Sequence, residues 1–101
     1  MIFEKLVRDK IPEIIKQDGG QAVTRVLSDE EYRVCLEKKL DEEVAEYHES
    51  GELEELADVL EVVYALAQAQ GHTVEELLSA CQKKRDRRGS FSQKFFLIER
   101  R

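Results

Sequence analysis

The stretch from residue 39 to residue 58 constrains the fold most, because two segments with helical periodicity meet there at a short polar break. The break is centred on Ser50 and Gly51, and glycine is the residue that most easily ends a helix. The pattern predicts one helix over about 29–49 and a second over about 52–70. With so short a connection, we expect the two helices to pack as an antiparallel hairpin.

The first of these helices has an unusual face. Ser28 and Glu31 fit a capping box, which predicts where the helix starts. At 100° per residue, the apolar face carries Tyr32, Leu36, Leu40 and Tyr47. Lys39, Glu43 and Glu46 fall on that same face. Charged residues therefore interrupt the apolar stripe instead of lying opposite it.

The second helix is apolar almost all round, with ten apolar residues: Leu53, Leu56, Ala57, Val59, Leu60, Val62, Val63, Tyr64, Leu66 and Ala67. A helix with this pattern is buried on several sides. A chain of 101 residues has little material to surround it, so we expect burial against a second subunit in a homodimer or homotetramer. Glu55 and Asp58 lie on one of its apolar faces.

The remaining segments predict two further helices and two short extended runs. A short helix is expected near Pro12, capped by Asp9, and a longer one over about 74–88, started by a capping box at Thr73. Residues 22–27 and 93–98 are β-prone, and we expect them to be extended or to pair as short strands. The fold class expected for residues 1–101 is a single all-α domain built on the helical hairpin.

Four carboxylates are the strongest candidates for chemistry. Glu43 and Glu46 precede the turn, and Glu55 and Asp58 follow it with the same spacing. In an antiparallel hairpin centred on the turn, Glu46 would face Glu55, and Glu43 would face Asp58. Four converging carboxylates favour a hard divalent cation such as Mg²⁺, with Mn²⁺ as a substitute. The alternative is a solvated acidic seam, since glutamate is a common surface residue of helices.

Three further glutamates near these carboxylates are weaker candidates for metal ligands, because of their positions around the helices. Glu42 and Glu54 fall further round their helices than the four carboxylates, so they are less suited as ligands. Glu61 lies near the edge of the inner face, where it could support the site or form a salt bridge.

Cations near the ends of the chain could meet phosphate groups. Lys84 and Arg88 belong to a run with five cations in residues 83–88, which favours phosphate binding or, equally, a solvated helix end. Arg8 and Lys10 form a second basic group. Lys39 lies one helical turn before Glu43, so it could contact a phosphate or pair with that carboxylate.

The overall charge excludes one class of function. With a net charge of −6, the chain is not expected to bind a nucleic-acid polymer, whose affinity depends on cationic contacts to phosphate.

No apolar run reaches the length of a membrane span, and the N-terminal residues lack the pattern of a secretory signal. Two cysteines without metal-type spacing are expected to be buried free thiols, so we expect a cytoplasmic protein.

Three motifs resemble one protein family. Glu42-Glu43-x-x-Glu46 followed by Glu55-x-x-Asp58 resembles the EExxE…ExxD signature of the all-α nucleoside triphosphate pyrophosphohydrolases, the MazG-like group. That superfamily includes phosphoribosyl-ATP pyrophosphohydrolase and dimeric dUTPases. The segments 5–12 (KLVRDKIP) and 84–91 (KRDRRGSF) resemble a compact subgroup of house-cleaning pyrophosphatases.

This resemblance implies a Mg²⁺-dependent enzyme that cleaves between the α and β phosphates to give a nucleoside monophosphate and pyrophosphate. Glu43, Glu46, Glu55 and Asp58 would be the catalytic residues and metal ligands, with activated water as the nucleophile. Five cations would bind the phosphates: Lys39, Lys84, Arg88, Arg8 and Lys10. The family's active sites lie near subunit interfaces.

The chain departs from the family pattern at two places. Only eight residues separate Glu46 from Glu55, which suggests a reduced or rebuilt base pocket. Ser90 stands where a second glycine is expected, so a close approach of the backbone to phosphate is less certain there. Phosphoribosyl-ATP hydrolysis, a non-catalytic nucleotide- or protein-binding module and a purely structural helical dimer are the alternatives.

Overall fold

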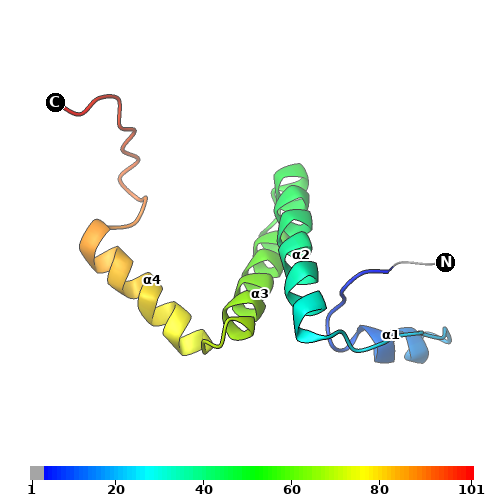
Figure 1. The fold of residues 1–101 in the computed structure, drawn as a ribbon. Helices are drawn as coiled ribbons and strands as arrows, with labels where there is room; N and C mark the ends of the chain where they lie inside the picture. The colour runs from blue at the N-terminus through cyan, green and yellow to red at the C-terminus, as the bar shows by residue number, and fades with distance from the viewer. Residues whose placement is uncertain (1–3) are drawn as a thin grey trace.

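The computed structural model describes residues 4–101, and every regular element in that range is a helix. Four helices follow in the order α1 (Ile11–Gln17), α2 (Asp29–Ser50), α3 (Leu53–Ala69) and α4 (Val74–Arg88) (Figure 1). The prediction of an all-α fold is therefore confirmed. Within the described range, no helix has both the length and the apolar character needed to cross a membrane.

Helices α2 and α3 form the expected antiparallel hairpin, which is the centre of the molecule (Figure 1). Helix α2 ends at Gly51, whose φ of 68° lies in the left-handed region where a side chain would be strained. The backbone N–H of Gly51 donates to the carbonyl of Tyr47 at 2.7 Å. This cap reverses the chain within two residues and aligns the start of α3 with the end of α2.

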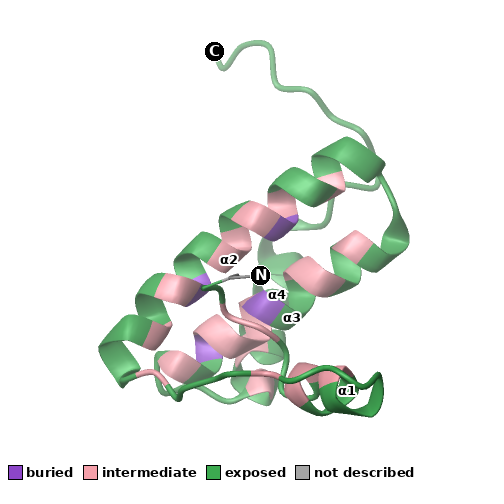
Figure 2. Ribbon diagram, turned by 90° about the vertical axis from the view of Figure 1, so that its right-hand side faces the viewer, coloured by how far each residue is buried: buried purple, intermediate pink, exposed green. Residues whose placement is uncertain are grey.

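The core lies between the facing sides of the hairpin (Figure 2). In the part of the chain that is described, the buried apolar side chains are Leu36, Val62 and Ala67. Half-buried residues such as Leu40 and Leu66 surround them. So small a core leaves the far side of α3 open: Leu53, Leu56 and Leu60 are 79%, 44% and 46% exposed.

Helix α4 begins with the second predicted capping box. The Thr73 hydroxyl accepts from the backbone N–H of Glu76 at 3.0 Å, and the Glu76 carboxylate accepts from the N–H of Thr73 at 3.1 Å. The helix packs on α3 alone and then leaves the hairpin (Figure 1). Its apolar side is therefore largely uncovered in one copy, where Leu78 and Cys81 are exposed. Cys81 and the half-buried Cys35 are free, so the expected burial of both thiols is wrong.

Two local details differ from the prediction: of the two alternatives for residues 22–27 and 93–98, the pairing as strands is wrong, and so is the cap of the first helix. Residues 22–27 and 93–98 do not pair, and neither segment is a strand; they lie on opposite sides of the molecule (Figure 1). A strand needs a neighbouring strand for its hydrogen bonds, and the direction of α4 keeps the two segments apart. The residue preceding α1 is Lys10, not Asp9, and its side chain makes no capping bond. Pro12 lies in the first turn of α1, as predicted.

Candidate metal centre

One turn of α2 gathers three carboxylates. Oxygen atoms of Glu42, Glu43 and Glu46 lie within 4.8 Å of one another, a spacing that a single ion could bridge. Positions three and four apart on a helix share a face, which explains the grouping. Such acidic clusters are common on protein surfaces, so the environment of each carboxylate decides whether this cluster is unusual.

Glu43 is the unusual member because it is buried, with only 7% of its surface exposed. Its Oε1 atom lies 3.3 Å from the Lys39 ammonium. Its Oε2 atom is buried and has no hydrogen-bond partner. Buried carboxylate oxygens are almost always bonded, since an unpaired one loses its hydration without compensation. The missing partner and the oxygen-only donor set fit a hard divalent cation.

Lys39 is the internal counter-ion of this cluster. Its ammonium lies 3.6 Å from Glu42 and 3.3 Å from Glu43, and its side chain is only 18% exposed. Of the two roles that the sequence left open, the structure shows the ion pair with Glu43. A contact between Lys39 and a phosphate stays a prediction.

The pKa of Glu46 is raised because the Glu43 carboxylate lies close to it. The main cause that raises the pKa of Glu46 is a hydrogen bond that its protonated form can donate to Glu43, and repulsion from the same carboxylate adds to it. Glu46 therefore holds its proton to a higher pH than an ordinary glutamate does. A cation between the two carboxylates would remove this penalty, so cation binding should weaken as the pH falls through the raised pKa.

The other two predicted ligands lie outside the three-carboxylate cluster. Glu55 is half-buried in the first turn of α3. Asp58 follows it, and its Oδ1 atom accepts from the Arg8 guanidinium at 2.6 Å. The structure thus brings together Glu43 and Glu46 of the four predicted ligands and adds Glu42, which its helical phase had made a weaker candidate.

The phosphate-binding candidates are dispersed in one copy of the chain. Arg8 donates to Asp58 on α3. The two residues are 50 positions apart, and no local signal in the sequence predicts this contact. Lys10 is exposed beside the first turn of α1. Lys84 and Arg88 are exposed on α4, which does not contact α2. Only Lys39 and Arg8 therefore lie against predicted ligands.

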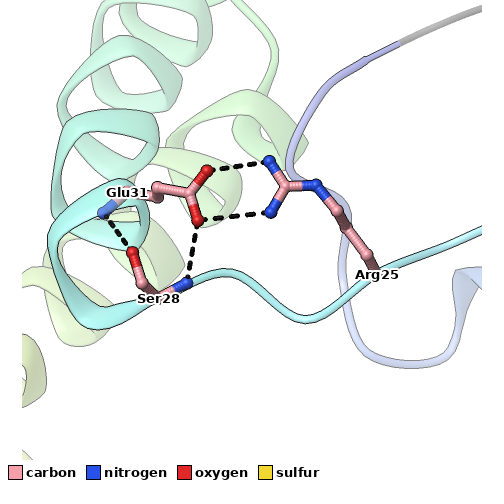
Figure 3. Close-up of polar contacts among 3 residues, drawn as sticks. All are labelled: Arg25, Ser28 and Glu31. Atoms are coloured by element: carbon pink, nitrogen blue, oxygen red, sulfur yellow. Dashed lines mark hydrogen bonds and ion pairs between the residues drawn. The ribbon is translucent and has the colours of Figure 1, made fainter.

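Arg25 and Glu31 form a second polar group, which no pattern in the sequence predicts. The Arg25 guanidinium donates two hydrogen bonds to the Glu31 carboxylate, at 3.2 and 2.8 Å (Figure 3). Glu31 also accepts from the backbone N–H of Ser28 at 3.1 Å. The Arg25 hydrogen bond, with those from Ser28, lowers the pKa of Glu31 to about 2. Every oxygen here is partnered, so this group fixes the start of α2 and offers no open ligand position.

Comparison with known proteins identifies no family for this chain. No family model and no solved structure matches it. A protein from Mycolicibacterium smegmatis (strain ATCC 700084 / mc(2)155), described only as an uncharacterized protein, is 60% identical over 42 residues. The match covers 42% of this chain, and the chain spans less than half of that relative's length, 43%.

Proposed function

We propose that this protein is a Mg²⁺-dependent nucleoside triphosphate pyrophosphohydrolase that releases a nucleoside monophosphate and pyrophosphate. The single observation that carries the proposal is the buried Oε2 atom of Glu43, which lacks a partner beside two further carboxylates. The motif resemblance supplies the reaction class. Phosphoribosyl-ATP stays open as the substrate, as does a modified nucleotide.

The residues divide into two roles in this proposal. Glu42, Glu43 and Glu46 would hold the cation, and Glu55 and Asp58 on α3 would complete the ligand set. Bound there, the cation would neutralise charge on the phosphates and orient them for attack by water. Lys39 and Arg8 already lie against these carboxylates, so they can transfer from carboxylate to phosphate as the substrate binds. Lys84, Arg88 and Lys10 would bind the leaving pyrophosphate.

The cellular setting and assembly belong to the same proposal. The free cysteines agree with a reducing cytoplasm. The open apolar side of α3 favours a homo-oligomer, since an exposed apolar stripe of this size marks an interaction surface.

The test is a screen for pyrophosphate release from standard and modified nucleoside triphosphates and phosphoribosyl-ATP with Mg²⁺ or Mn²⁺. We expect turnover of at least one substrate, and a loss of at least about 100-fold in kcat for Glu43→Gln, equivalent to about 2.7 kcal/mol. The matched control is Glu37→Gln on the exposed side of α2, which should retain wild-type turnover. Absence of pyrophosphate across the panel, or full activity of Glu43→Gln, would contradict the proposal.

A further inference from the structure

The C-terminal segment leaves the molecule as an uncovered arm. After α4, residues 89–101 extend away from the hairpin without regular structure (Figure 1). Five large apolar residues of this segment are 81–98% exposed: Phe91, Phe95, Phe96, Leu97 and Ile98. Each aromatic side chain can bury about 150–250 Å² in a packed interface. Such a concentration of exposed aromatic residues marks a surface that is covered by a partner.

The dimensions of a single copy show how much surface needs a partner. Its accessible area is 9520 Å², whereas a compact monomer of 11.7 kDa exposes about 5,900 Å². Its radius of gyration is 17.8 Å, compared with about 13 Å for a compact domain of this length. The excess area exceeds the ~1,000–2,500 Å² that each partner buries in an obligate homodimer.

The charge distribution indicates that the partner is a second copy. Residues 29–69, which form the hairpin, contain fourteen acidic and three basic residues. Residues 83–101, which end α4 and form the tail, contain eight basic and two acidic residues. Among the described residues, the cations Lys83, Lys84, Arg87 and Arg88 have no ion-pair partner. The chain therefore carries both halves of a complementary interface, held apart by the direction of α4.

The hairpin also carries a matching apolar surface. Leu53, Leu56 and Leu60 recur at helical spacing along α3, and all three are exposed. The stripe lies on the side of α3 away from the buried Val62, so α2 does not cover it. An apolar stripe in an acidic hairpin suits a segment that combines apolar residues with cations.

We propose that two copies exchange arms: the basic end of α4 and the apolar tail of each copy dock on the α3 stripe of the other. The exchange gives a closed two-fold dimer in which the same pair of surfaces is used twice. It covers the tail and the stripe together and pairs Lys83 and Arg87 with hairpin carboxylates. This assembly requires neither nucleotide nor metal, so it stands apart from the proposed function.

Disulfide trapping between differently tagged copies tests the exchange. In a Cys35→Ser/Cys81→Ser background, one copy carries Phe96→Cys, and the other carries Leu53→Cys, Leu56→Cys or Leu60→Cys in turn. Mild oxidation of the mixed copies should link the two tags for at least one stripe position. The control pairs Phe96→Cys with Val26→Cys, since Val26 is an apolar residue in the loop before α2 that is more exposed than any stripe position.

Two outcomes of the trapping experiment would overturn the exchange. One is linkage between Phe96→Cys and the stripe positions that is no greater than linkage to Val26→Cys. The other comes from a chain that carries Phe96→Cys and a stripe cysteine together: in that chain, disulfides would form only within a single copy and never between two copies. A second measurement uses light scattering, in which Lys83→Glu/Arg87→Glu should raise the dimer dissociation constant at least tenfold. Neither position is assigned to phosphate, so pyrophosphate release can fail while the exchange stands, and the reverse. An unchanged dissociation constant in this variant would also contradict the proposal.

Discussion

Replacing Lys39 with glutamine tests whether its ion pair with Glu43 stabilises the candidate site. The Lys39 ammonium lies 3.3 Å from a carboxylate oxygen of Glu43, and the two side chains are 18% and 9% exposed. Removal of one partner from a buried ion pair costs about 3–5 kcal/mol, because the other charge stays buried without compensation. Here Glu43 already has an unpartnered oxygen, so we expect a loss of at least about 3 kcal/mol.

The assay is urea unfolding followed by circular dichroism at fixed protein concentration, without divalent cations. For a slope of about 1–3 kcal/mol per molar urea, a loss of 3 kcal/mol lowers the midpoint by about 1–3 M. Lys38→Gln is the matched control, since Lys38 is the preceding residue of α2, is exposed and forms no ion pair with another described residue. It should change stability by no more than about 0.5 kcal/mol.

Repeating the measurement with Mg²⁺ links the ion pair to the proposed cation. Any ligand that binds only the folded state at ten times its dissociation constant adds about 1.4 kcal/mol of stability. The addition should be larger for Lys39→Gln than for wild type, because the cation then replaces the missing ammonium. Equal stabilities of Lys39→Gln and Lys38→Gln, or a loss that Mg²⁺ leaves unchanged, would refute this reasoning.

Three further changes test other parts of the structure. Leu36→Ala should lose about 2–5 kcal/mol of stability by urea unfolding, because Leu36 is only 2% exposed, whereas Val34→Ala on the open side of α2 should be nearly neutral. The pKa of Glu31 is lowered to about 2, so its stabilising contribution should be present above pH 4.5 and be lost as the pH falls toward 2. Glu31→Gln should therefore be less stable than wild type at pH 7, and the difference should shrink as the pH falls through about 2; a constant difference would contradict the assignment. Arg8→Gln should bind Mn²⁺ more tightly by calorimetry, because it frees Asp58, while its stability changes by less than about 1 kcal/mol; weaker binding would show that Arg8 does not compete with the cation.

The sequence predicts the helices well because their signals are local. Ser28 with Glu31 and Thr73 with Glu76 place two helix starts correctly, and Gly51 places the turn of the hairpin. Helical phase also predicts that Glu43 lies on the apolar face, where the structure buries it. Each of these features depends on residues within one or two turns of one another.

The errors and omissions depend on contacts between distant parts of the chain. The Arg8–Asp58 ion pair joins residues 50 positions apart, and neither residue has a local pattern that predicts it. Residues 22–27 and 93–98 have β-propensity without a neighbouring strand, so the strand alternative, which rested on propensity alone, fails. Glu42 joins the cluster through Glu46, which lies four positions further along α2 and is also three positions from Glu43.

Hydrolysis of a substrate nucleotide in ¹⁸O-labelled water, followed by ³¹P nuclear magnetic resonance, tests the central proposal most directly. Attack of water at the α-phosphate should place the label in the nucleoside monophosphate and leave the pyrophosphate unlabelled. Glu43→Gln should give no labelled product under the same conditions, and Glu37→Gln should give the wild-type result. Label in inorganic phosphate or pyrophosphate, or labelled monophosphate formed at the same rate by Glu43→Gln, would contradict the proposed reaction at this carboxylate cluster.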